Sequence, residues 1–167
     1  MSWPSALALL IKLEGGFVET NPPEGVTFAG IMKSYYGDWC QAHGRPAIWR
    51  PTPEAVGSYY FDEYWQPNHC GDFPTPADAV ALQMVVNLPT QRARQLFQIA
   101  LGVFPDSDLG PVSLGAIKNW HPLDLADRLL IAQSAHYCDV REIGDADFKG
   151  LLDRVQSVKD AMVAGTI

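Results

Sequence analysis

The residue best suited to chemistry in this sequence is Glu14, at the predicted end of the first helix. It continues an apolar stripe of Leu7, Leu10 and Ile11 at helical spacing, so its position predicts partial burial. The glycine pair at 15–16 predicts the helix C-terminus, because glycine readily adopts the left-handed conformation found there. Burial and the negative end of the helix dipole both favour a protonated carboxyl. We therefore interpret Glu14 as a candidate general acid, the alternative being a glutamate that rotates into solvent.

The elements that must position this glutamate are predicted to be mostly helices. The first helix spans about 5–14, and residues 17–31, rich in Pro, Gly and Thr, suit an irregular loop or a small hairpin. A capping threonine before a proline predicts helix starts at Thr52-Pro53 and Thr75-Pro76. The second of these helices is apolar on nearly every side, which is typical of a central buried helix. Later helices are predicted at 93–100, closed by Gly102, and at 113–119, 123–140 and 147–163.

Two amides interrupt that apolar helix. Gln83 and Asn87 are four residues apart and so share one helix face. Such a pair either lines a cleft or satisfies hydrogen bonds within the helix, and the sequence leaves both options open. The aromatic residues Tyr64 and Trp65 could stack on sugar faces or pack in the core, and for Tyr64 we favour the core.

The composition bounds the class of protein. A chain of 167 residues that is 47% hydrophobic fits one compact domain, or one domain with a small helical appendage. Three cysteines without a CxxC pair disfavour a disulfide framework and a thiolate metal site, and we expect no metal and no cofactor. A net charge of −7 disfavours nucleic acid as a partner. We expect neither a membrane span, which needs about 20 apolar residues, nor a signal peptide.

Several motifs together resemble one family. The opening Glu14-Gly15-Gly16-Phe17-Val18, followed by Gly25-Val26-Thr27 and Gly30-Ile31, resembles that of the glycoside hydrolase family 108 lysozymes, which are N-acetylmuramidases of phages and of bacterial lysis proteins. Residues 60–65 are similar to the family's Tyr-x-x-x-Tyr-Trp helix. Residues 96–111 and 148–155 are similar to its peptidoglycan-binding region and its terminal Phe-x-x-Gly-Trp-x-x-Arg-Val motif. The ordered set covers almost the whole chain.

The chain also departs from the family pattern. Glu24 stands in place of the first glycine of a Gly-Gly pair, and Phe28-Ala29 replaces Asn-Tyr. Gln83 stands where the family typically has Asp, and Leu88-Pro89 replaces Ser-Gly. A leucine, 151 or 152, replaces the tryptophan of the terminal motif. These differences indicate a divergent member and bear on activity more than on fold.

The resemblance implies roles for individual residues. Glu14 would protonate the leaving oxygen, Glu24 would supply the second carboxylate, and Thr27 would position the attacking water, as in phage-type lysozymes. An exposed loop acid and a turn-capping hydroxyl are the alternatives for Glu24 and Thr27. The predicted substrate-binding residues are Gln83, Asn87 and Trp65.

We therefore expect an all-α, lysozyme-like fold with a small loop or hairpin lobe after the first helix. Residues 1–90 would form the catalytic region, and residues 91–167 a helical, peptidoglycan-binding-like region packed into the same compact unit. The expected function is hydrolysis of the β-1,4 bond between N-acetylmuramic acid and N-acetylglucosamine in peptidoglycan. The alternative is a catalytically inactive wall-binding or structural protein of a phage particle.

The expected biological setting follows from that function. The protein would be made in the bacterial cytoplasm and act in the periplasm or cell wall, as a phage endolysin or a virion-associated lysozyme. Export would depend on a holin, or delivery on a phage tail, and a free protein is expected to be a monomer. The sequence does not discriminate these settings from that of a bacterial lysis protein.

Overall fold

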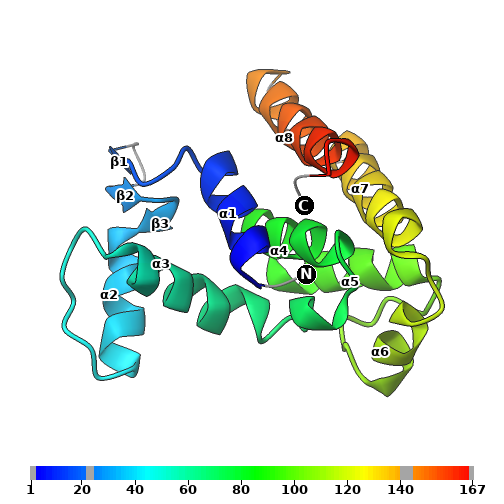
Figure 1. Cartoon of the computed structure of the whole chain (residues 1–167), viewed down its shortest axis with the longest axis horizontal. Coiled ribbons are helices and arrows are strands. Elements are labelled where there is room, and N and C mark those ends of the chain that lie inside the picture. Colours follow the sequence, from blue (N-terminus) through cyan, green and yellow to red (C-terminus); the bar gives the residue numbers. More distant parts are fainter. Residues whose placement is uncertain (1–2, 22–24, 140–144, 166–167) are drawn as a thin grey trace.

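The chain folds into a bundle of helices with a small sheet at one side (Figure 1), as a computed structural model shows. The structure describes residues 3–21, 25–139 and 145–165. Helix α1 (Trp3–Leu13) leads into strands β1 (Glu19–Thr20), β2 (Thr27–Phe28) and β3 (Ile31–Met32). The elements that follow are α2 (Lys33–Ala42), α3 (Pro53–Tyr60), the π-helical turn η1 (Phe61–Trp65), the 3₁₀ turn η2 (Cys70–Asp72), α4 (Ala77–Asn87), α5 (Thr90–Leu101), α6 (Pro111–Ile117), α7 (Pro122–Asp139) and α8 (Asp145–Val163).

Helix α4 is the centre of the bundle. Every residue from Ala77 to Val85 is buried, because α4 packs against α1, α5 and α7 as well as the turns η1 and η2. The predicted all-round apolar helix is thus confirmed. Helix α8 packs on α7 at the outside of the bundle (Figure 1). Glu14 follows α1, so its position depends on how α1 sits on α4.

Local capping explains where several helices begin and end. The Thr52 hydroxyl accepts a hydrogen bond from the Ala55 amide (3.3 Å), and Pro53 occupies the first turn of α3, as predicted. Gly102 ends α5 in the left-handed conformation, also as predicted. Thr75 was wrongly predicted to cap α4. Its hydroxyl instead donates to the Asp78 carboxylate (2.9 Å), and α4 begins at Ala77 without a side-chain cap.

The segment after α1 forms the expected small lobe. Strands β1, β2 and β3 pair antiparallel in that order, with Glu19 opposite Phe28 and Phe28 opposite Ile31. The β2–β3 turn consists of Ala29 and Gly30, which both have positive φ (+51° and +77°), as a type I′ hairpin requires. Helix α2 follows this hairpin directly and was not predicted from the sequence.

The cysteines are all free among the described residues. Cys40 and Cys70 are buried, as expected for small apolar groups. Cys138 is exposed on α7.

Two neighbouring buried tyrosines of α3 make the stability of the fold sensitive to alkaline pH. The ring centroids of Tyr59 and Tyr60 lie 5.6 Å apart, and both residues are almost fully buried. Burial raises the pKa of each hydroxyl. Above pH 10, roughly the pKa of an unburied tyrosine, the unfolded chain releases protons that the folded chain retains. The free energy of unfolding should therefore fall as the pH rises through this range. Urea unfolding monitored by circular dichroism at several alkaline pH values, with phenolate absorbance recorded in parallel, checks this; an unchanged urea midpoint would contradict it.

Candidate active site

Glu14 immediately follows α1, in the turn that closes the helix. Its amide donates to the Leu10 carbonyl (2.9 Å), and the Gly16 amide donates to the Ile11 carbonyl (2.7 Å). Gly15 and Gly16 have φ values of +86° and +84°, so the Gly-Gly pair closes the helix as predicted. The Glu14 side chain is 16% exposed, which confirms the partial burial expected from its place on the apolar stripe.

Three elements surround the Glu14 carboxyl. One is the β2–β3 turn: a Cβ atom at Gly30 would lie 2.8 Å from both Glu14 Oε2 and the Tyr60 hydroxyl. The second is α3, whose Tyr60 hydroxyl donates to the Ala29 carbonyl (2.8 Å) and so holds that turn in place. The third is α8, which contributes Arg154. The carboxyl therefore lies between the hairpin, the α3 helix and the C-terminal helix.

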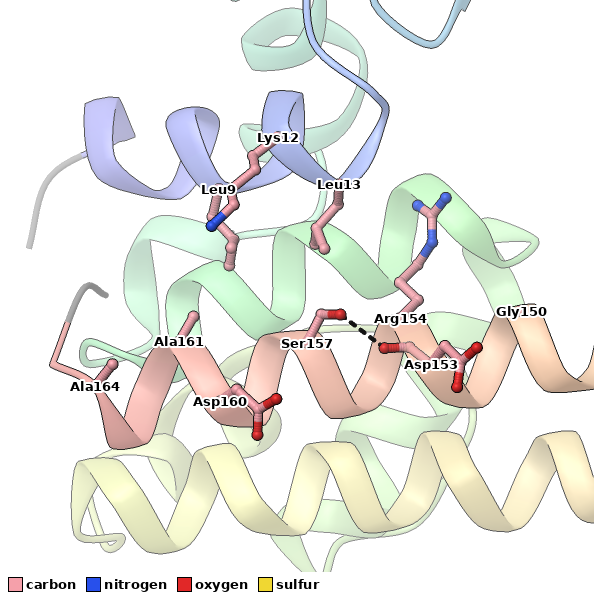
Figure 2. Close-up of a pocket in the computed structure, with 10 residues that line it drawn as sticks. All are labelled: Leu9, Lys12, Leu13, Gly150, Asp153, Arg154, Ser157, Asp160, Ala161 and Ala164. Atoms are coloured by element: carbon pink, nitrogen blue, oxygen red, sulfur yellow. Dashed lines mark hydrogen bonds between the residues drawn. The ribbon is translucent and has the colours of Figure 1, made fainter.

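Arg154 binds Glu14 directly. Its Nη1 donates to Glu14 Oε1 (2.5 Å), and this ion pair joins residues 140 positions apart in the sequence. Figure 2 shows the Arg154 side chain reaching from α8 toward the end of α1. Both partners are mostly shielded, with side chains 23% and 16% exposed, so the attraction is screened less than in a surface pair. The argument from sequence considered burial and the helix dipole and had no means of including this guanidinium.

The electrostatics of the site extend to Tyr60. Burial raises the pKa of the Tyr60 hydroxyl, and the negative charge of Glu14 raises it further, while Arg154 acts in the opposite direction. Tyr60 is thus a neutral hydrogen-bond donor beside Glu14 at neutral pH. It fixes the turn against which the carboxyl packs.

The other predicted catalytic residues lie on the hairpin. Thr27 is half-buried in β2, and its hydroxyl hydrogen-bonds to the Thr20 hydroxyl across the sheet (2.6 Å). Glu24 lies outside the described residues. The neighbouring acid Glu19 accepts from Trp49 Nε1 (2.9 Å) and Arg50 Nε (3.0 Å), and the Arg50 guanidinium holds its pKa below the usual range. This contact ties β1 to the loop before α3.

The predicted substrate-binding amides are not brought to the surface together. Gln83 is 1% exposed in the core of α4, and both polar atoms of its side chain lack a hydrogen-bond partner within the described part of the chain. Asn87 is partly buried and donates to the Gln83 carbonyl (2.8 Å). The sequence left open whether these amides line a cleft or form hydrogen bonds within the helix. Asn87 does the second. The burial of Gln83 does not support contact with a substrate.

Trp65 also lies in the core. It is 8% exposed and packs edge to face against Trp3 (ring centroids 5.1 Å apart) and closely against Gly71. The prediction that Trp65 stacks on a sugar ring is therefore wrong for this structure, because its ring faces are covered by α1 and η2. Its neighbour Tyr64 remains partly exposed, with its ring 5.7 Å from that of Tyr60.

Three residues of this site were not identified from the sequence as functional: Gly30, Tyr60 and Arg154. All three lie in motifs that carried the resemblance, the Gly-Ile pair, the Tyr-x-x-x-Tyr-Trp helix and the terminal Arg-Val. Only the fold reveals that these motifs meet at Glu14.

Within the described residues, His, Cys, Asp and Glu side chains form no cluster of three or more that could hold a metal ion. None of the described helices has the combination of length and hydropathy that a membrane span requires.

Comparisons with known proteins are consistent with this geometry. The family model of glycosyl hydrolase 108 matches residues 7–88. A solved structure of Brucella abortus SagA has the same fold, with a TM-score of 0.75 and 24% sequence identity over 97% of this chain and 94% of that chain. A search of curated proteins found no match. The family match includes Glu14, Gly30 and Tyr60, whereas Arg154 lies outside it.

Replacing Gly30 by Ala should destabilise the fold by about 2–4 kcal/mol, because the new Cβ overlaps Glu14 and Tyr60 and the positive φ strains the backbone. Gly102→Ala is the matched control, since Gly102 has nearly the same φ (+76°) but no atom within 4 Å of the added Cβ. That variant should lose only about 1 kcal/mol. Urea unfolding of both variants measures the difference, and equal losses would refute the close approach at Gly30.

Replacing Arg154 by Met should cost about 1–2 kcal/mol of unfolding free energy, because Glu14 is left shielded without its cation. Lys159→Met removes the same charge from the exposed face of α8 and should change stability by less than about 0.5 kcal/mol. Thermal and urea unfolding of the two variants would show equal midpoints if the ion pair contributed nothing.

Proposed function

This chain is a divergent member of the glycosyl hydrolase 108 family, and we propose that it hydrolyses the β-1,4 bond between N-acetylmuramic acid and N-acetylglucosamine in peptidoglycan. The observation that carries the proposal is the position of Glu14. It is a shielded carboxyl at the end of the first helix, held by residues of three separate elements. A mostly helical, lysozyme-like fold that positions one acid in this way suits glycoside hydrolysis.

In the proposed reaction, the protonated form of Glu14 donates its proton to the glycosidic oxygen as the bond to the anomeric carbon breaks. Glu14 acquires negative charge in this step. Arg154, whose guanidinium already contacts Oε1, is positioned to stabilise that charge as it develops. Tyr60 and Gly30 keep the carboxyl from rotating away. Arg154 thus acts through Glu14 and is a positioning residue.

A second group must act from the opposite face of the sugar ring, where a carboxylate either attacks the anomeric carbon or activates a water, and the hairpin supplies the candidate groups. We infer that Thr27, whose hydroxyl is already oriented by Thr20, holds this water. Glu24, in the segment between β1 and β2, remains the proposed second carboxylate. Its separation from Glu14 would decide between an inverting and a retaining mechanism.

The proposed setting is the bacterial cell wall, with the protein acting as a phage endolysin or a virion-associated lysozyme. The competing function is that of a wall-binding or structural phage protein that has lost catalysis. Two observations bear on it: Gln83 replaces a family acid and is buried, and Trp65 is covered. Neither residue offers a surface to a sugar, so substrate contacts would have to come from other side chains.

Glu14→Gln should abolish lysis of outer-membrane-permeabilised Gram-negative cells in a turbidity assay. Mass spectrometry of fragments released by the wild type should show reducing N-acetylmuramic acid ends. The melting temperature should stay within a few degrees, because the amide oxygen can still accept from Arg154 and about 1 kcal/mol corresponds to a few degrees at this size.

Glu63→Gln, an exposed glutamate of η1, is the control and should retain activity. Lysis by Glu14→Gln would show that the acid is wrongly assigned. Absence of release by folded wild-type protein, together with its sedimentation on purified peptidoglycan, would favour the non-catalytic wall-binding function.

A further inference from the structure

A groove runs between α1 and α8 beside the candidate active site. It has a volume of about 650 Å³, within the range of sites that bind small ligands. Figure 2 shows Lys12, Leu9 and Leu13 on its α1 side and Asp153, Ser157 and Asp160 on its α8 side. Among the described side chains that line it none is aromatic, so this part of the groove lacks the flat apolar faces on which sugar rings usually stack.

The groove is continuous with the Glu14 site. Arg154 lines the groove, and its guanidinium binds the Glu14 carboxyl. A glycan strand with its scissile bond at Glu14 would therefore place a substituent of the reacting sugar at the mouth of the groove. The groove is long enough for a short peptide: Asp153 and Asp160 are seven residues apart on α8, about 10 Å along the helix, which about three extended peptide residues would span.

The charges of the groove are of both signs. Lys12 lies on one wall, and Asp153 and Asp160 lie on the other. In the part of the chain that the structure describes, no hydrogen bond or ion pair engages the Lys12 ammonium or the Asp153 carboxylate. A purely anionic ligand would be repelled by the two aspartates, and a purely cationic one by Lys12, whereas the charge of Arg154 is paired with Glu14. The lining thus fits a ligand that carries both charges.

We propose that this groove binds the peptide attached to the glycan strand, with its carboxylates toward Lys12 and its ammonium toward Asp153 and Asp160. The inference rests on the proposed function, because peptidoglycan supplies such a peptide next to the scissile bond. Wall peptides carry free carboxylates and, at a diamino acid, an ammonium group. The groove would make the enzyme prefer glycan strands that still bear peptides over strands from which an amidase has removed them.

The test compares two double variants of the full chain that leave the net charge unchanged. Lys12→Met/Asp160→Asn removes one charge of each sign from the groove. Lys118→Met/Asp127→Asn removes the same charges from exposed positions near the α6 end and on α7 and is the matched control. For each protein, kcat/KM is measured on peptide-bearing glycan strands and on amidase-treated strands.

The wild type and the control should cut peptide-bearing strands more efficiently than bare strands, and the groove variant should lose about tenfold of that preference. A tenfold change corresponds to about 1.4 kcal/mol, as expected for charge-assisted contacts. An equal substrate ratio in all three proteins would overturn the proposed groove while leaving the hydrolase function intact.

A second readout does not depend on activity. A soluble diaminopimelate-containing tripeptide is added to the isotope-labelled chain, and amide NMR shifts are recorded. Shift changes confined to α1 and α8 that disappear in Lys12→Met/Asp160→Asn support the groove even if no strand is cut. No shift changes in the wild type, or changes that persist in that variant, overturn it. Failure of hydrolysis alone concerns the proposed function.

Discussion

Burial of α4 on all sides is the constraint on which the geometry of the site depends. Helix α1, which ends immediately before Glu14, packs on one side of α4, while α7 packs on another side of α4 and also against α8, which carries Arg154. The ion pair between Glu14 and Arg154 is thus positioned by three successive helix contacts, which are α1 with α4, α4 with α7, and α7 with α8. Close packing transmits small displacements, so a change of volume in the α4 core would alter the alignment of two side chains that lie outside it.

The small lobe contributes through a second constraint. The Ala29–Gly30 turn approaches Glu14 so closely that no side chain fits at residue 30, and the Tyr60 hydroxyl holds the turn through the Ala29 carbonyl. The carboxyl is therefore confined by backbone on one side and by a guanidinium on the other. Confinement of this kind reduces the rotational freedom that a flexible glutamate would otherwise lose in the transition state. Together, these helix contacts and the hairpin turn fix the orientation of the Glu14 carboxyl, although the motifs involved are distributed over the whole chain.

Much of this architecture follows from local sequence signals. The glycine pair after Glu14, the Thr52 cap and Gly102 identify helix ends, and the uniformly apolar run of α4 identifies the central helix. Long-range contacts leave no such signal, which is why Arg154 was not predicted as the partner of Glu14. Gln83 and Trp65 were predicted to bind substrate because of their residue types and their positions in the family motifs. Both are buried, because packing around α4 and η1 decides which face of a helix is covered. Helix α2 was missed, since its glycine and aromatic residues give a weak helical pattern.

The family match ends at residue 88, directly after α4, yet α4 is covered on two sides by α5 and α7, which follow it in the chain. A fragment that stopped there would expose an apolar helix to water and would also lack the arginine that binds Glu14. The matched segment is therefore not a portable module. Recombining this protein with other wall-targeting parts requires junctions outside α1 and α8, so the natural unit of exchange is the helical body as a whole.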